Sequence, residues 1–249
     1  MTTIAGPSGT NWDRLAQQID ADSAASLAVR LHRLIMAAIQ SGDLRPGARL
    51  KEADLVAAMN VSRTPLREAL AALRADGVLD MDADGLCVRQ LGWHDIRGLY
   101  DLRGTLEGMA ARLAATHSGH AERAVIDAIC ATESELIATG ATPIVLAEHN
   151  RRFHKAILEA AGNRFLGESL DRLSRMMVLL GATAYSLPQR VGAICDEHIA
   201  INAAIQSGAG ATAQSGAGAT AEAAMQAHLQ AALTARLTLL SQPADAELD

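Results

Sequence analysis

Three histidines in the C-terminal half of the chain, His154, His198 and His228, have side chains that could bind a metal ion. Asn150 lies four residues before His154, and residues with that spacing share one face of a helix. Three neutral imidazoles and one amide oxygen suit Zn²⁺, Ni²⁺ or Mn²⁺, and they leave positions open for water or an oxygen-bearing ligand. The spacing also fits ordinary histidines at the edge of a core or on a surface, so both interpretations stay open. His149 is expected to face solvent, because it points away from the helix face that carries Asn150.

Arg103 is a second candidate for ligand binding, since it follows Tyr100 and Leu102 in a largely apolar stretch. A guanidinium group directed into a cavity between helices would bind a carboxylate through two parallel hydrogen bonds. The alternative is an ion pair with Glu107, one helical turn further along. From the residues alone, the ion pair is the favoured interpretation.

Arginine and hydroxyl side chains gather at the start of a predicted helix in residues 61–79. Ser62 can accept a backbone N–H as the N-cap residue, and three leucines at helical spacing form one face to bury. Arg63, Thr64 and Arg67 lie near the exposed N-terminal end, where the helix dipole favours anions. A short helix with this end suits the major groove of DNA, because arginine can bind guanine and hydroxyl groups can reach phosphates.

The elements around this helix predict a winged helix-turn-helix. Amphipathic helices are expected over 24–40 and 50–59, and Asn60 suits the left-handed backbone of a tight turn. Short strands at 78–81 and 86–89 flank a turn and read as a small hairpin, the wing.

The remainder of the chain predicts helices, so the fold class is mainly α: an N-terminal winged helix-turn-helix and a C-terminal, all-helical bundle. A bundle of this size can hold an internal ligand cavity. The six helices are expected at about 93–117, 120–139, 143–161, 163–185, 188–206 and 219–240. The expected divisions are a flexible tail (1–23), a DNA-binding domain (24–92), an effector-binding and dimerisation domain (93–241) and a second tail (242–249).

One octapeptide, QSGAGATA, occurs twice in succession, at 206–213 and 214–221. Two copies are too few for a repeat architecture. The Gly, Ala and Ser composition instead predicts a flexible surface loop over 206–221. The identity of the two copies indicates that the loop arose by a small tandem duplication.

Composition sets broad limits. No apolar run is long enough to cross a bilayer, and the first residues lack the pattern of a signal peptide, so a cytoplasmic protein without membrane contact is expected. The three cysteines are too few and too far apart for a disulfide framework. The net charge is −6, but residues 24–92 hold nine Lys and Arg against eight Asp and Glu. Any affinity for DNA must therefore come from the local placement of arginines.

Taken together, the motifs resemble the GntR family of transcriptional regulators, and within it the FadR subfamily with a C-terminal FCD ligand-binding domain. In the first domain the resemblance rests on GDLRPGARL at 42–50, VSRTPLREAL at 61–70, Leu73 and DGVL at 76–79. In the second it rests on DLR at 101–103, LE at 106–107, NRRFH at 150–154, AGN at 161–163, EH at 197–198 and MQAHL at 225–229.

The resemblance implies a divalent metal held by Asn150, His154, His198 and His228. It also implies a small carboxylate or sugar-acid effector, for which Arg103 and Asn202 are the candidate binding residues. The last two histidines of the family commonly lie about 22 residues apart. Here the interval is 30, and removing one octapeptide copy restores the family spacing.

The resemblance further implies a homodimer on a palindromic double-stranded operator, most often as a repressor. The implied DNA contacts are Arg49, Ser62, Arg63, Thr64, Arg67 and the wing around Gly85. Two features depart from the family pattern: Ala53 stands where relatives often have arginine, and the wing carries Asp80, Asp82 and Asp84 in place of basic residues. The helix that begins after Ser62 is therefore expected to dominate binding.

Two alternatives remain. A metal-dependent hydrolase would use the same histidines, but no well-placed acid and base accompany them, so we expect no enzyme. A regulator whose signal is the metal ion itself would need no carboxylate at all.

Overall fold

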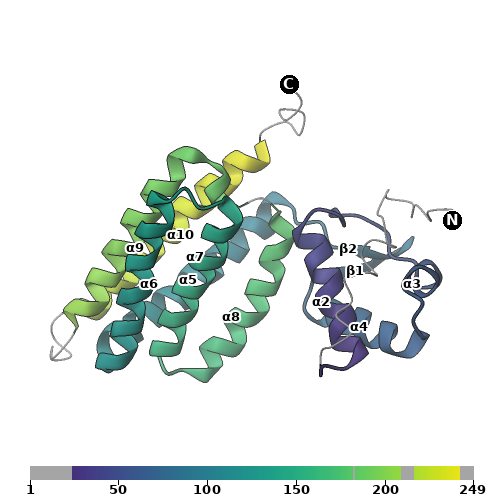
Figure 1. Ribbon diagram of the computed structural model, residues 1–249, viewed down its shortest axis with the longest axis horizontal. Coiled ribbons are helices and arrows are strands. Elements are labelled where there is room, and N and C mark those ends of the chain that lie inside the picture. The colour runs from purple at the N-terminus through teal and green to yellow at the C-terminus, as the bar shows by residue number, and fades with distance from the viewer. Residues whose placement is uncertain (1–23, 182, 209–215, 242–249) are drawn as a thin grey trace. The chain divides into compact units, whose positions relative to one another are not determined.

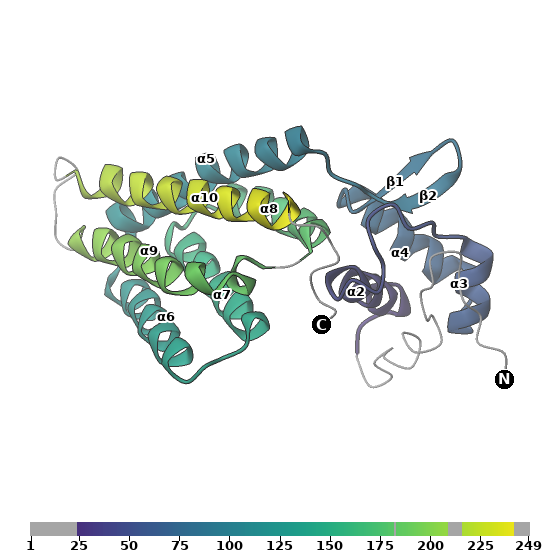
Figure 2. The same ribbon diagram turned by 90° about the horizontal axis from the view of Figure 1, so that it is seen from above.

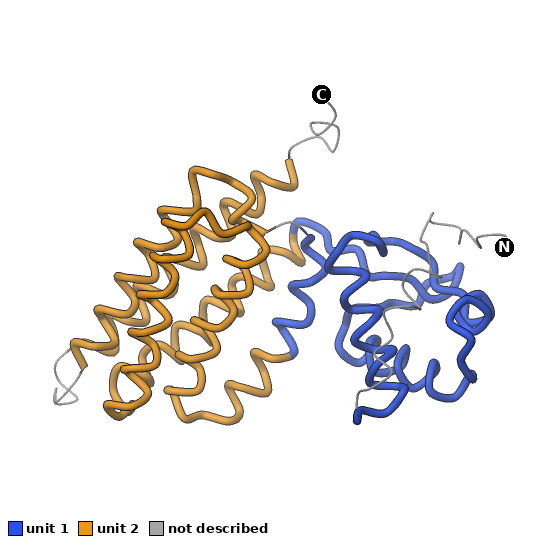
Figure 3. Tube along the Cα trace, viewed as in Figure 1, with its two compact units in different colours: residues 1–93, 172–181 blue, residues 94–171, 182–249 orange. Residues whose placement is uncertain are grey.

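The computed structural model describes residues 24–181, 183–208 and 216–241, which form two compact units (Figures 1 and 3). The predicted tails, 1–23 and 242–249, lie outside the described residues. The N-terminal unit extends to Trp93 and also includes residues 172–181. The C-terminal unit comprises the rest of the chain.

The N-terminal unit is a winged helix-turn-helix. Its helices and strands are α2 (Leu27–Gln40), α3 (Glu52–Met59), α4 (Arg63–Ala75), β1 (Leu79–Asp82) and β2 (Gly85–Val88). The strands are antiparallel, with Leu79 opposite Val88 and Asp82 opposite Gly85. The leucines expected to form the buried face of α4 are buried. They pack with side chains of α2 and the wing in one apolar core.

The turn between α3 and α4 has the predicted backbone conformation. Asn60 is left-handed, with φ +49° and ψ +48°, and it is the one residue other than glycine with positive φ in the described part of the chain. Ser62 occupies the N-cap position of α4, but its side chain makes no capping hydrogen bond. The expectation that its hydroxyl group caps the helix was therefore wrong.

The C-terminal unit is built from long helices (Figure 2). They are α5 (Trp93–His117), α6 (His120–Ala138), α7 (Pro143–Ala160), α8 (Arg164–Met177), α9 (Pro188–Ser207) and α10 (Ala217–Ser241). Of α8, only the part up to Asp171 belongs to this unit. Helix α9 lies between α6 and α10, and α6 also packs against α7. The core combines alanines of α5 with larger side chains such as Phe153, Ile157 and Ile201.

The helix expected over 163–185 is interrupted. Helix α8 ends at Met177 and is followed by two short 3₁₀ helices, η1 (Val178–Leu180) and η2 (Ala184–Ser186). The cause is Gly181, whose φ of +69° and ψ of −128° cannot continue a helix. Within the N-terminal unit, Leu179 of η1 joins the apolar core.

The expected flexible loop over 206–221 was too long at both ends. The first octapeptide begins inside α9, whose C-cap is Gly208, and the second supplies the first turn of α10. Close packing on α5 explains why both helices extend into the octapeptides, because a Cβ atom on Gly208 would lie 1.9 Å from the carbonyl oxygen of Ala115. A Cβ atom on Gly218 would lie 2.9 Å from Thr116. Residues 209–215 lie outside the described part of the chain.

Among the described helices, none is long and apolar enough to span a bilayer.

Candidate metal centre and nucleic-acid interface

Three histidines from different helices meet inside the C-terminal unit. His154 of α7, His198 of α9 and His228 of α10 each offer a ring nitrogen, and these three atoms lie within 4.8 Å of one another. The Nε2 atoms of His154 and His228 are 3.3 Å apart. Two nitrogens bound to one Zn²⁺ at about 2.0–2.1 Å would be separated by roughly 3 to 3.4 Å. The spacing of this pair therefore fits shared coordination of one ion.

Each imidazole in this histidine triad is oriented by its own glutamate. A carboxylate can only accept, so Nδ1 carries the proton, and in the neutral ring Nε2 keeps its lone pair for the centre of the triad. Such carboxylate partners are typical of histidines that bind metals, because they fix both the tautomer and the ring orientation. The three pairs, measured from Nδ1 to a carboxylate oxygen, are His154–Glu107 at 2.5 Å, His198–Glu133 at 2.6 Å and His228–Glu197 at 2.7 Å.

The glutamates are in turn held by donors on their other side. The Nε atom of Arg103 donates to Glu107 at 2.6 Å, and the Tyr185 hydroxyl donates to Glu133 at 2.7 Å. Arg190 binds Glu197 through two hydrogen bonds of 2.9 Å each. Burial would raise the pKa of each carboxyl group, but the bound donors outweigh burial and hold all three pKa values below the ordinary value. The glutamates are therefore ionised acceptors.

Burial also keeps two of the imidazoles neutral. It lowers the pKa of His228 to about 4, and it lowers the pKa of His198 as well. A neutral imidazole is the form that binds metal, because the protonated ring has no free lone pair.

The observation that most directly supports a metal site is the Nε2 atom of His198. His198 is fully buried, and this nitrogen has no hydrogen-bond partner among the described residues. The ring stacks on Phe153 with 4.2 Å between centroids, which fixes its direction. Because buried polar atoms are nearly always paired, an unpaired nitrogen beside two other histidines fits a metal site.

Asn150 lies half-buried on α7, one turn before His154. Asn202 is buried on α9 one turn after His198, where its amide donates to Asp127 at 2.8 Å and accepts from Gln206 at 3.0 Å. His149 is also buried, and its Nε2 lies 2.8 Å from a backbone carbonyl oxygen. The expectation that His149 faces solvent was therefore wrong.

Sequence reasoning named Arg103 and all three histidines but missed most of the residues that orient them. Glu107 was named as the ion-pair partner of Arg103, and that predicted ion pair is confirmed. Glu133 and Tyr185 carry no local signal, because Glu133 lies 65 residues from His198 and Tyr185 lies 52 residues from Glu133.

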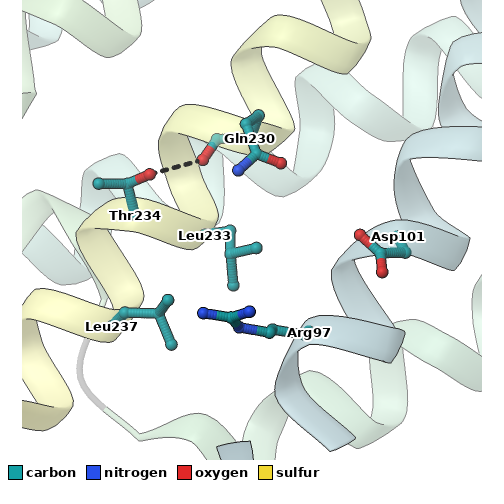
Figure 4. Close-up of a pocket in the computed structure, with 6 residues that line it drawn as sticks. All are labelled: Arg97, Asp101, Gln230, Leu233, Thr234 and Leu237. Atoms are coloured by element: carbon teal, nitrogen blue, oxygen red, sulfur yellow. Dashed lines mark hydrogen bonds between the residues drawn. The ribbon is translucent and has the colours of Figure 1, made fainter. Parts of the chain in front are cut away.

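A shallow groove lies elsewhere on the C-terminal unit, between α5 and α10 (Figure 4). Its lining residues are Arg97, Asp101, Gln230, Leu233, Thr234 and Leu237. None of the candidate metal-, effector- or DNA-binding residues lines it, so the groove and the triad are different features.

The start of α4 is exposed, as a surface that reads DNA must be. Ser62, Arg63 and Thr64 all face solvent. The Nε atom of Arg67 donates to both carboxylate oxygens of Glu52 on α3, at 2.9 and 3.0 Å. This pair is exposed, so solvent weakens it.

The wing holds Arg49 in a similar way. Arg49 forms ion pairs with Asp82 and, at 3.3 Å, with Asp84, and it donates to the carbonyl oxygen of Gly85 at 3.2 Å. Gly85 has φ +115°, a conformation suited to glycine at the tip of the hairpin.

A winged helix-turn-helix followed by a helical ligand-binding domain defines a class of DNA-binding transcription regulators. Comparison with known families agrees with this class. Residues 27–83 match the bacterial regulatory proteins of the gntR family, and residues 98–231, more than half of the chain, match the FCD domain. The chain belongs to the GntR family of transcription regulators, in its FCD-containing branch.

Several curated proteins are similar. A probable D-xylose utilization operon transcriptional repressor from Paenarthrobacter nicotinovorans is 32% identical over 168 residues, which cover 66% of this chain and 72% of the relative. The Nta operon transcriptional regulator from Aminobacter aminovorans is 45% identical over 83 residues, or 33% of this chain and 40% of the relative.

Solved structures show the same fold. E. coli McbR/YncC matches with a TM-score of 0.69 at 20% identity, covering 87% of this chain and all of that one. A putative transcriptional regulator GntR from Rhodococcus sp. RHA1 matches with a TM-score of 0.64 at 22% identity, covering 86% and 99% respectively. Both families and the relatives are transcription regulators, so the protein is a regulator and not an enzyme. The alternative of a metal-dependent hydrolase is thereby set aside.

Proposed function

We propose that the protein is a metal-containing repressor that leaves its operator when a small carboxylate binds to the C-terminal domain. One observation carries the metal part: three imidazoles converge, each with a glutamate on Nδ1 and with Nε2 directed to the centre. Zn²⁺, Ni²⁺ or Mn²⁺ suits this donor set, and Asn150 is the proposed fourth ligand. When bound, the ion would supply a positive charge and open positions for an oxygen-bearing ligand.

The proposed effector is a small carboxylate or sugar acid that binds next to the triad. Arg103 supports this, because its guanidinium group is nearly buried and contacts Glu107, the partner of His154. An incoming carboxylate would share Arg103 with Glu107, which links effector binding to the orientation of His154. Asn202 is the second proposed contact of the effector, and its amide group already forms hydrogen bonds with Asp127 and Gln206.

On DNA, the proposed contacts are Arg49, Ser62, Arg63, Thr64, Arg67 and Gly85. The exposed start of α4 would enter the major groove, and a homodimer would place two copies on a palindromic operator. The proposed action on DNA favours a cytoplasmic protein. The name of the Paenarthrobacter relative, a repressor of a sugar operon, favours repression and an effector derived from a sugar.

The test begins with metal. Purified protein is stripped with a chelator and titrated with Zn²⁺, Ni²⁺ and Mn²⁺ by calorimetry, with His117→Ala as a control because His117 is an exposed histidine outside the triad. We expect one ion per chain for the wild-type protein and for the control. No binding of any of the three ions to the wild-type protein would refute the metal site.

The second arm uses a duplex that the protein selects from a random pool. Binding is followed by fluorescence anisotropy with metal alone, and then with metal and a panel of small carboxylates and sugar acids. We expect release only with one class of carboxylate. Release by metal alone would instead identify the ion as the signal, and resistance to the whole panel would refute the carboxylate effector.

A further inference from the structure

The wing of the helix-turn-helix is held together by an arginine and two acidic residues. The backbone of Arg49 lies antiparallel to β2 and pairs with that of Cys87 in an isolated β-bridge. Backbone hydrogen bonds on either side fix this position, from Leu50 N to Leu86 O and from Val88 N to Ala48 O, both at 2.9 Å. The Arg49 side chain is therefore anchored at the edge of the hairpin.

One of the two carboxylates that bind Arg49 is itself held by the backbone of the hairpin turn. Asp82 ends β1, and its Oδ1 atom accepts a hydrogen bond from the backbone N–H of Asp84 at 2.9 Å. The same oxygen pairs with the Nη1 atom of Arg49, while Asp84 pairs with Nη2. Two carboxylates thus occupy the guanidinium group from the side of the hairpin turn.

This arrangement resembles what a DNA phosphate would offer. Carboxylate and phosphate oxygens both accept hydrogen bonds from the arginine fork. A phosphate can bind Arg49 only after displacing Asp82 and Asp84, and both carboxylates repel the phosphate while they remain nearby. All three side chains are partly or largely exposed, so the pairs are weak enough to exchange.

We propose that Asp82 and Asp84 are specificity-determining residues, which compete with DNA phosphates for Arg49 and thereby lower the affinity for unrelated DNA. Phosphate contacts contribute most of the binding to unrelated DNA, whereas base contacts distinguish sequences. Weakening a phosphate contact in the wing leaves discrimination to the exposed start of α4. The inference uses the proposed placement of Arg49 at the DNA but not the proposed metal or effector.

The test compares substitutions in the wing that remove the same charge. Asp82→Asn and Asp84→Asn free Arg49, whereas Asp80→Asn is the matched control, because Asp80 lies on the same strand but pairs with Arg89. Affinity for an unrelated duplex is measured by fluorescence anisotropy over a series of salt concentrations. The Asn side chain at 82 keeps an oxygen to accept from Asp84 N, so the turn is preserved.

We expect Asp82→Asn alone to bind the unrelated duplex more tightly than Asp80→Asn, which removes the same charge. The double variant Asp82→Asn/Asp84→Asn should bind it about 3- to 10-fold more tightly than wild type, with a salt slope steeper by about one unit. Asp80→Asn should change the affinity by less than about 2-fold. Adding Arg49→Ala to the double variant should remove the gain, because Arg49 is the group that the substitutions release.

Two results would overturn the proposal. Equal gains from Asp80→Asn and Asp82→Asn would show that net charge alone matters, and a gain that survives Arg49→Ala would show that Arg49 is not the released group. Binding of the selected operator by the wild-type protein, measured in the same assay, shows whether the proposed operator function stands when this inference fails.

Discussion

Cationic or proton-donating side chains meet carboxylates in two regions of the molecule, with opposite consequences. In the histidine triad, His198 and Glu133 are both almost completely buried, with exposed side-chain fractions of 0% and 1%. On the surface proposed to contact DNA, the Arg67 and Glu52 side chains are 64% and 32% exposed. A buried pair cannot exchange with water, so it sets the direction of a side chain, whereas an exposed pair can give way to another anion.

The largest effect is expected when the histidine triad loses one of its three imidazoles. His198→Ala removes the nitrogen that has no partner among the described residues, and metal affinity should fall by roughly a hundredfold or more, beyond the 10–100-fold typical for a supporting residue. Competition with a chromophoric chelator measures the affinity, and the increase in Tm on adding metal gives a second readout. Unchanged affinity would show that the triad is not the metal site.

A smaller loss is expected when only the orienting group changes. Glu133→Gln keeps the shape of the side chain but removes the ionised acceptor for His198 Nδ1, so metal affinity should fall about 10- to 100-fold. Glu135→Gln, an exposed position on the same helix, is the matched control and should have no effect. If the two variants behave alike, Glu133 does not orient His198, and the contrast between the two regions fails.

The smallest effect is expected for Glu52→Gln on the exposed surface. Because its pair with Arg67 exchanges readily, operator affinity should change by less than about 3-fold. Arg67→Ala, in contrast, should cost roughly 1–3 kcal/mol if Arg67 reads a base, and Arg74→Ala, at the other end of α4, serves as its control. Anisotropy titrations measure all three variants. A loss in Glu52→Gln as large as in Arg67→Ala would mean that Glu52 positions Arg67, as Glu133 is proposed to position His198.

The sequence was most informative where the structure is determined by neighbouring residues. The left-handed turn at Asn60, the leucine face of α4 and the hairpin of the wing all depend on local signals, and all three are present. The fold class and the family followed from the same motifs.

Errors arose where distant residues decide. Glu133 and Tyr185 could not be linked to His198 from the chain order, because folding alone brings them together. The break in the helix predicted at 163–185 has a local cause instead: the backbone conformation of Gly181, which lies in a stretch that otherwise favours a helix. The ordered ends of the predicted loop depend on the close approach of Gly208 and Gly218 to α5.

The duplicated octapeptide determines how the connection between α9 and α10 can change in length. Because its two copies are identical, removing either one gives the same shorter chain, in which Gly208 and Gly216 become a single residue. Gly208 has φ −73° at the end of α9, and Gly216 has φ +75° before α10. One residue cannot hold both conformations, so a shorter chain would have to unwind the end of one helix. The duplication gives each helix its own terminal glycine, and later insertions between these two glycines would leave both helix ends unchanged.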